Sequence, residues 1–256
     1  MKHFYSIFII AKLTASEWIR LKFFHIIIFF GLVFIGFSQM LSSLSFAVVE
    51  RLLFDFGLSG LELGVIMISS LIGTHSIQRE IDRKTLFVLL ARPIPRTHIV
   101  LGSWLSIMIL CLLFSVGFLG SLIFSSGRTT HNLGLVIAMI SSMSKAMVIS
   151  SFAIACGLLV RPILALGATV CYWVLCYSLP DIKFFVSKLK DQFLINLVDT
   201  FEFFIPQFHR YNWKSFYFVT NMPTGSEITW SIFHSLGWTF LWLFLAALFF
   251  RRKEIV

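Results

Sequence analysis

The 256-residue chain is 58% hydrophobic and only 13% charged, and phenylalanine alone contributes 30 residues. A soluble domain usually carries about twice that charged fraction, so the composition excludes an ordinary water-soluble fold and favours a polytopic membrane protein. The formal net charge of +9 does not indicate nucleic-acid binding, because most lysines and arginines cluster in short segments on one predicted side of the membrane.

The first 22 residues are predicted to form an interfacial helix. Lys12, Glu17 and Arg20 interrupt them too often for a span, while Lys12, Ser16 and Arg20 fall on one side of a helix. The opposite side is apolar and comprises Phe4, Phe8, Ala11, Ala15 and Trp18. We therefore expect an amphipathic helix that lies at the membrane surface. A cleaved signal peptide is the alternative, although only about eight apolar residues precede Lys12.

Six later stretches meet the length of about 20 apolar residues that a spanning helix requires. They are residues 23–46, 57–75, 99–125, 133–160, 162–179 and 228–250. An even number of spans puts both termini on one side, and basic residues near both ends predict that this side is the cytoplasm. The sequence thus predicts an all-α, single transmembrane domain (1–256) in the cell (inner) membrane.

The fourth and fifth of these stretches are joined only at Arg161–Pro162, which predicts a tight antiparallel hairpin. Small residues recur along the fourth stretch, from Ser141 to Gly157. Small side chains let membrane helices approach closely, so we expect this span to pack tightly against its neighbours.

The segment 76–97 interrupts the apolar sequence with five basic and two acidic residues, which is typical of a cytoplasmic loop. Residues 78–90 are predicted to form a short helix of about three turns. Pro93 and Pro95 stop that helix, and Pro95 can begin the next one.

The same segment resembles the stretch between the second and third spans of type 2 ABC-transporter permeases. The residues that carry the resemblance are Glu80, Thr85, Leu86, Leu89, Leu90, Pro93, Arg96 and Gly102. Lys84 and Ser103 depart from the family pattern, which usually has glycine and lysine at these positions.

The resemblance implies that 76–97 is a cytoplasmic coupling segment that docks into a separate ATPase subunit. ATP would then be bound by that partner, and a second permease copy or a related permease chain would complete the transporter. The implied coupling residues are Glu80, Arg83, Thr85, Leu89, Pro93 and Arg96. An ordinary cytoplasmic loop without a partner is the alternative.

Residues 181–227 form the one sizeable segment predicted on the external side. Apolar residues recur there every three or four positions, which predicts an amphipathic helix that ends at Pro206. This segment either braces the bundle at the lipid surface or shapes an external exit or partner contact.

One ionisable residue lies deep in a predicted span. Lys145 falls near mid-membrane, and Glu62 is the only acidic residue similarly placed. A buried charge is costly in lipid and therefore marks a candidate functional site. Either Lys145 is structural, snorkelling or pairing with Glu62, or the two residues line the path of an anionic substrate.

Sequence motifs for catalysis are absent. The chain contains neither a G-x-x-x-x-G-K-[ST] phosphate loop nor an H-E-x-x-H zinc motif, and its histidines are scattered singly. The cysteines are expected to be buried small hydrophobes, at Cys111, Cys156, Cys171 and Cys176. We therefore expect no catalytic, cofactor or metal site in this chain. The predicted function is the permease subunit of an ABC-type exporter, with a structural subunit or a lipid-modifying enzyme as alternatives.

Overall fold

The computed structural model of the protein describes residues 2–44, 49–82, 95–126, 132–189, 191–213 and 223–252. Within these ranges the chain is helical and contains no strand, which confirms the predicted all-α fold. The elements are α1 (Lys2–Arg20), α2 (Lys22–Leu44), α3 (Val49–Asp82), α5 (Arg96–Ser126), α6 (Asn132–Leu159), α7 (Pro162–Leu189), α8 (Gln192–Phe204), the 3-10 turn η1 (Phe208–Tyr211) and α9 (Gly225–Arg252).

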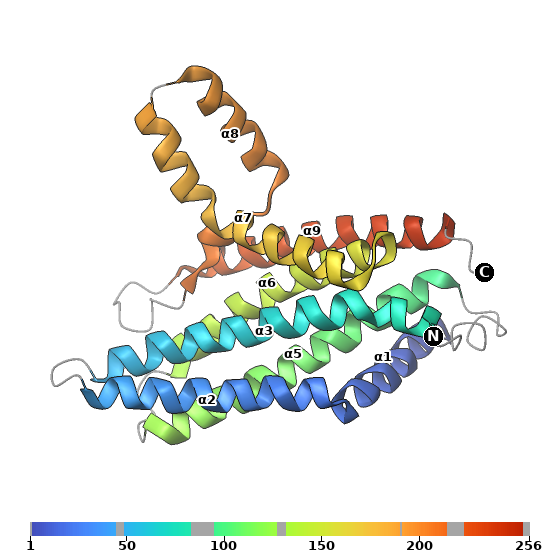
Figure 1. Cartoon of the computed structure of the whole chain (residues 1–256), viewed down its shortest axis with the longest axis horizontal. Coiled ribbons are helices and arrows are strands. Elements are labelled where there is room, and N and C mark those ends of the chain that lie inside the picture. Colours follow the sequence, from blue (N-terminus) through green and yellow to red (C-terminus); the bar gives the residue numbers. More distant parts are fainter. Residues whose placement is uncertain are drawn as a thin grey trace.

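The long helices run up and down in alternation, so the start of α1 and the end of α9 lie at the same end of the bundle (Figure 1). In the described ranges, five helices are long and apolar enough to cross a membrane, namely α3, α5, α6, α7 and α9. Helix α2 occupies the place of the first predicted span. Among the residues of α2 whose side chains the structure describes, the apolar stretch is Ile27–Phe37, which is shorter than a full span, so the predicted count of six spans is not confirmed.

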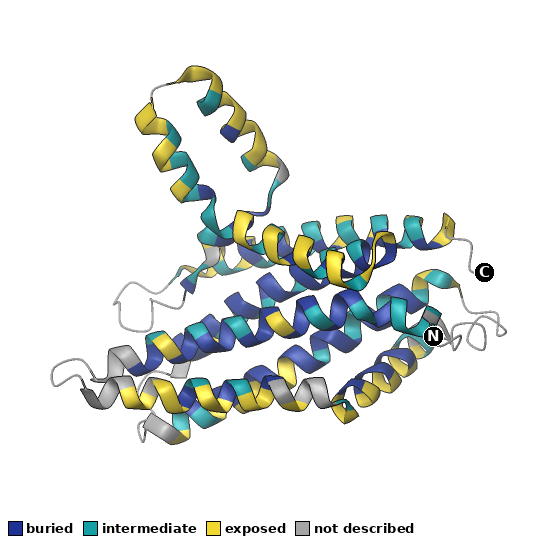
Figure 2. Cartoon of the chain, in the orientation of Figure 1, coloured by how far each residue is buried: buried dark blue, intermediate teal, exposed yellow. Residues whose placement is uncertain are grey.

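Helices α3 and α6 form the centre of the bundle. Buried residues concentrate in α3, α5 and α6, whereas α7, α8 and α9 are more exposed (Figure 2). A Cβ atom at Gly73 would lie 2.6 Å from the Cβ of Ala153, and one at Gly157 would lie 2.5 Å from the carbonyl oxygen of Thr74. The predicted close approach of the small-residue helix to its neighbour is thus confirmed.

Helix α1 packs along α5 through one side that includes Ile10, Ala11 and Trp18. Ala11 and Trp18 belong to the predicted apolar side, but Phe8, which was predicted to share it, is 58% exposed. Ile10 takes the inward position because it fits against Gly102 of α5, where the missing side chain leaves room.

The predicted hairpin between the fourth and fifth spans is confirmed, since α6 ends at Leu159 and α7 begins at Pro162. Helix α7 is longer than the predicted fifth span, because the helix continues past residue 179 through Pro180 to Leu189. Proline removes one helical hydrogen bond and tends to bend a helix without always ending it.

The prediction of a single amphipathic helix before Pro206 was wrong, because the chain folds there as two helices, the end of α7 and α8. Asp191 is the N-cap of α8, and its side chain accepts a hydrogen bond from the backbone N–H of Phe193 at 3.0 Å. This cap starts a new helix, so the end of α7 and α8 form an antiparallel pair. Helix α8 does end before Pro206, as predicted.

Helix α9 begins with a capping box. The backbone N–H of Thr224 donates to Glu227 Oε2 at 2.9 Å, and the N–H of Glu227 donates to Thr224 Oγ1 at 3.4 Å. These reciprocal bonds satisfy backbone donors that the first turn of a helix leaves unpaired. The Thr-x-x-Glu spacing therefore fixes where the last span begins.

The close α3–α6 crossing predicts that Gly157→Ala destabilises the protein. The added methyl group would meet the backbone of Thr74, which cannot move independently, so we expect a cost of about 1–3 kcal/mol. Thermal unfolding of the detergent-purified protein measures this cost. Gly237→Ala is the control, because no atom lies within 4 Å of the added Cβ. Equal unfolding temperatures for the two variants would contradict the prediction.

Candidate functional site

A buried ion pair joins the two central helices. The ammonium group of Lys145 on α6 lies 2.7 Å from Oε1 of Glu62 on α3, and the two side chains are 0% and 4% exposed. The lysine therefore pairs inward and does not snorkel towards a surface. The small residues at the α3–α6 crossing let the two backbones come close enough for this contact.

Two residues from the second half of the chain complete the surroundings of Lys145. Its Nζ donates to Asn212 Oδ1 at 3.2 Å, and Asn212 Nδ2 donates to the hydroxyl oxygen of Tyr177 on α7 at 2.8 Å. The lysine also lies 5.8 Å from the centre of the Tyr177 ring, within cation–π range. We call Glu62, Lys145, Tyr177 and Asn212 the polar centre.

Asn212 reaches this position because the chain re-enters the bundle after α8. Phe208 of η1 and Trp213 are both buried and pack with Ile66, Val148 and Cys176 in a second, smaller hydrophobic core. Asn212 lies between these two aromatic anchors in the sequence. Burial of the two rings thus places the amide beside the lysine.

Sequence reasoning missed Asn212 and Tyr177. The segment that contains Asn212 was predicted to lie outside the membrane, although this residue is the only amide in the aromatic stretch 208–218. A single amide between two aromatic residues is a weak signal of a buried hydrogen bond. Tyr177 carried no signal beyond its place near the end of a predicted span.

A pocket of about 250 Å³ opens between α3 and α7 beside the polar centre. Its lining contains Ser59, Glu62, Leu63, Trp173, Val174, Tyr177 and Ser178. The fully buried Lys145 is not part of this lining. A molecule in the pocket would therefore meet the carboxylate side of the ion pair first.

Of the predicted coupling residues, the structure describes Glu80 and Arg96. Arg83, Thr85, Leu89 and Pro93 lie outside the described residues. The helix predicted to start at Gln78 does not start there, because residues 78–82 continue α3 without a break. An uninterrupted run of helix-compatible residues through Asp82 extends the span beyond its apolar part.

Arg96 connects the first turn of α5 to the end of α9. Its Nη1 donates to the backbone carbonyl of Phe250 at 2.9 Å, and its guanidinium lies 5.7 Å from the centre of the Phe250 ring. A cation at a helix C-terminus stabilises the exposed carbonyl groups there. Arg96 thus has a structural role at the end of the bundle where Glu80 also lies.

A second charged contact supports the same end. The guanidinium of Arg79 lies 3.6 Å from the carboxylate of Glu17 and 5.2 Å from the centre of the Trp18 ring. These contacts join the last turns of α3 and α1. The last turn of α3, which precedes segment 83–94, is therefore held against α1 by charge and aromatic packing.

The described residues contain no group of three or more His, Cys, Asp or Glu side chains that could hold a metal ion. The four cysteines are free. Cys111 and Cys176 are buried as predicted, whereas Cys171 is exposed on the outer side of α7. The expectation of burial was wrong for Cys171, because α7 contacts the bundle along one side only.

In the part of the chain that the structure describes, the helical bundle and its five apolar helices of spanning length fit a polytopic membrane protein. Residues 61–255 match the model of the ABC-2 family transporter protein family, and the chain belongs to that family. It is thus a membrane transport permease subunit, which is a transporter component and not itself an enzyme. None of the curated proteins compared with the chain matches it.

The polar centre predicts a large asymmetry between single and double substitutions. Lys145→Met leaves the carboxylate of Glu62 buried and uncompensated, so we expect a loss of about 3–5 kcal/mol of stability. Lys145→Met combined with Glu62→Met removes both charges and should recover most of that loss. Thermal unfolding of the purified variants measures both effects. If the double variant instead lost as much stability as Lys145→Met and Glu62→Met lose together, the two residues would not be coupled.

Proposed function

We propose that this chain is the membrane-spanning subunit of an ABC-type exporter that is energised by a separate ATPase. The protein lies in the inner membrane, with the segment 76–97 and both termini on the cytoplasmic side. The ATPase docks on this segment. Two permease chains, identical or related, assemble with two ATPase subunits. The observation that carries this proposal is the family match over 61–255, because it includes the whole segment 76–97.

The geometry of the bundle end supports this docking site. The last turn of α3 and the first turn of α5 flank the central part of the segment, and both are fixed to neighbouring helices through Arg79 and Arg96. A docking element transmits movement only if its two attachments are stiff. Force applied between these ends would therefore reach α3 and α5 directly, and α3 carries Glu62.

The energy source is proposed to be a partner because the chain has no phosphate-binding loop. Members of this family generally pair with an ABC ATPase. ATP would then be the cofactor of that partner subunit.

We further propose that Glu62 and Lys145 lie on the substrate path. The pocket between α3 and α7 borders Glu62, and a charged pair within a membrane-spanning bundle is a common feature of transport pathways. Movement of α3 relative to α7 would widen this pocket and bring the buried lysine within reach of a substrate.

The docking proposal predicts that Glu80→Lys weakens ATPase binding while the chain still inserts and folds. An unpaired charge in a desolvated interface costs about 2–5 kcal/mol, which corresponds to about 30-fold weaker binding or more. Pro93→Ala combined with Pro95→Ala should have a similar effect, because the backbone would no longer be fixed where the chain passes from the segment into the next helix. Co-purification of the ATPase with each variant is the measurement.

Asp181→Lys is the matched control, because it makes the same charge change on an exposed residue of α7 near the opposite end of the bundle. It should leave the amount of bound ATPase unchanged. If Glu80→Lys and the double proline variant both retain wild-type ATPase binding and turnover, the segment has no part in coupling. An ordinary cytoplasmic loop predicts that outcome, since an added lysine there only strengthens a cytoplasmic signal.

The path proposal predicts a different outcome for the exchanged pair, Glu62→Lys with Lys145→Glu. Exchange keeps one positive and one negative group, and Asn212 can serve either because an amide has both a donor and an acceptor. We expect the protein to fold and bind its ATPase, with a reduced ATP turnover by the assembled transporter. Wild-type turnover in the exchanged variant would identify the pair as a structural link only.

A further inference from the structure

Helices α2 and α5 leave an apolar groove of about 420 Å³ between them. Two of its lining residues, Phe114 and Phe118, are buried and form its base. Gly31 lets α2 lie close to these rings, because a Cβ atom there would be 3.2 Å from the Phe118 ring. At Gly117 of α5 a Cβ atom would meet no other atom within 4 Å, so the groove is open there. We call this space the α2–α5 groove.

The lining of the α2–α5 groove is apolar along its length. Ser121 is the one polar residue among the described lining residues, and its Oγ donates to the backbone carbonyl of Gly117 at 2.9 Å. The open side carries exposed aliphatic residues, namely Ile28 and Leu32 of α2 and Leu113 of α5. A polar ligand would lose its hydrogen bonds to water there without replacement. The groove therefore fits an alkyl chain.

Basic and polar side chains lie at one end of the groove. Ile19, near the end of α1, is a lining residue, and the exposed Arg20 follows it directly. Lys12 is also exposed and shares a side of α1 with Ile19, because seven residues make about two helical turns. On α2, the exposed His25 precedes Ile28 by three positions and shares its side. These polar residues form the mouth of the groove.

The mouth carries a positive charge. Glu17 is the only acidic residue of α1, and its carboxylate lies 3.6 Å from the guanidinium of Arg79. In the part of the chain that the structure describes, no carboxylate pairs with Lys12 or Arg20. Their two charges can therefore attract an anion from outside the protein.

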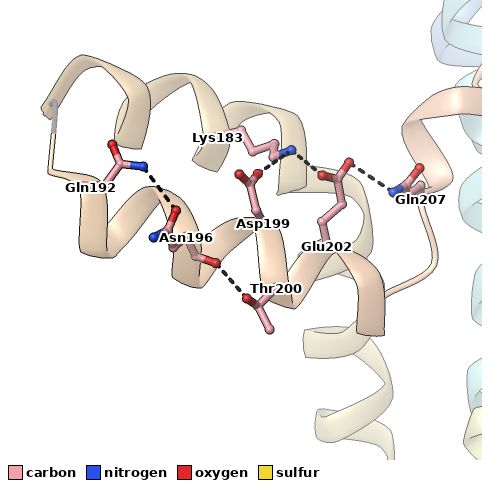
Figure 3. Close-up of polar contacts among 7 residues, drawn as sticks. All are labelled: Lys183, Gln192, Asn196, Asp199, Thr200, Glu202 and Gln207. Carbon is pink, nitrogen blue, oxygen red and sulfur yellow. Dashed lines mark hydrogen bonds and ion pairs between the residues drawn. The ribbon is translucent and has the colours of Figure 1, made fainter.

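A lysine near the opposite end of the bundle offers a contrast. The ammonium group of Lys183 lies 2.8 Å from Oδ1 of Asp199 and also pairs with Glu202 (Figure 3). Glu202 in addition accepts a hydrogen bond from Gln207 at 3.0 Å. Two carboxylates compensate the charge of this lysine, so it attracts a further anion less strongly than the mouth of the groove does.

The depth of the groove in the membrane follows from the length of α2. This helix begins at Lys22 and has 23 residues. Its length of about 34 Å is close to the hydrocarbon thickness of about 30 Å. The end of α1 and the start of α2 thus lie near the boundary of the hydrocarbon, while the lining residues from Ile28 to Ile35 lie within it. The groove runs from headgroup level into one leaflet, as an acyl chain does.

We propose that the α2–α5 groove binds an acyl chain of an anionic phospholipid whose phosphate lies within reach of Lys12 and Arg20. The chain covers the apolar lining, and the two basic residues select a negatively charged headgroup. Such a lipid matches both the apolar groove and the charge at its mouth. It joins α1 to α2 and α5, and it supports α1 where Glu17 contacts the last turn of α3. Neither the ATPase nor the direction of transport enters this inference.

Photolabelling with lipids tests the proposal. One probe is a phosphatidylglycerol with a photoactivatable diazirine in the middle of one acyl chain, and the other is a phosphatidylcholine with the same chain. The full-length protein is reconstituted in phosphatidylcholine vesicles that contain a trace of either probe. After illumination and digestion, mass spectrometry locates and quantifies the labelled residues. We expect the phosphatidylglycerol probe to label α2 and α5 along the groove, and to do so more strongly than the phosphatidylcholine probe.

Charge variants test the headgroup preference. One basic residue near the membrane surface changes the affinity for anionic lipid about fivefold. Lys12→Gln combined with Arg20→Gln should therefore lower groove labelling by phosphatidylglycerol about 25-fold. Arg252→Gln is the matched control, because it removes one exposed positive charge at the same end of the bundle, on α9. This control should leave the labelling unchanged.

Glycine variants test the groove itself. Gly117→Leu should fill the open part and remove the label from the lining. Gly120→Leu adds the same side chain on the same helix, at a position with no atom within 4 Å and outside the lining, and should keep the label. Thermal unfolding of both variants checks that they fold.

Two results would overturn the proposal. Equal labelling of the lining by the two probes, unchanged in the Lys12 and Arg20 variant, would make the groove an ordinary lipid contact without headgroup preference. Absence of label from the wild-type lining, with label elsewhere on the chain, would show that protein, such as a second copy, covers the groove.

Discussion

The ion pair between Lys145 and Glu62 is the constraint on which the rest of the bundle depends. Two charges without access to water cost several kcal/mol each unless they meet in good geometry with further hydrogen bonds. The 2.7 Å contact, the amide of Asn212 and the ring of Tyr177 supply those partners. The crossing of α3 and α6 through Gly73 and Gly157 therefore has an electrostatic consequence, because wider spacing would separate the pair.

The buried apolar residues of the bundle form two separate cores. The larger core gathers buried residues from α1, α2, α3, α5, α6 and α9, whereas the smaller core joins Cys176 of α7 and the re-entering segment to residues of α3 and α6. Helices α3 and α6 contribute to both cores. The outer layer made of α7 and η1 is thus attached to the central helices by a limited apolar contact and one polar centre. Such a boundary permits one layer to shift relative to the other without disrupting the larger core.

Much of the helical arrangement could be predicted from the sequence, because membrane-spanning helices are recognisable as long apolar runs. The α6–α7 hairpin and the candidate pair Lys145 and Glu62 could be identified in this way, since each depends on composition or on single charged residues. The course of α7 beyond Pro180 could not, because a proline signals both a helix end and a helix bend. Asn212 was also out of reach. Its role depends on the burial of Phe208 and Trp213 against helices far away in the sequence.

Arg96 and helix α1 show the same difference between what local sequence indicates and what contacts between distant residues decide. The positive charge of Arg96 was readable as a cytoplasmic signal, yet its hydrogen bond spans 154 residues to reach Phe250. Local spacing says nothing about such a partner. Likewise, Ile10 and Phe8 are both apolar, but Ile10 is buried against Gly102 of α5 and Phe8 is exposed.

The order of residues in the polar centre has a consequence for how the protein is made. Synthesis from the N-terminus delivers Glu62 to the membrane 83 residues before Lys145, and Asn212 follows 67 residues after the lysine. Helix α3 consequently carries a carboxylate without its partner until α6 is synthesised. The cost of leaving that group in hydrocarbon favours holding α3 back from the lipid until α6 can join it. Biogenesis would then proceed from an early α3–α6 pair, and the segment that bears Asn212 would close the polar centre last.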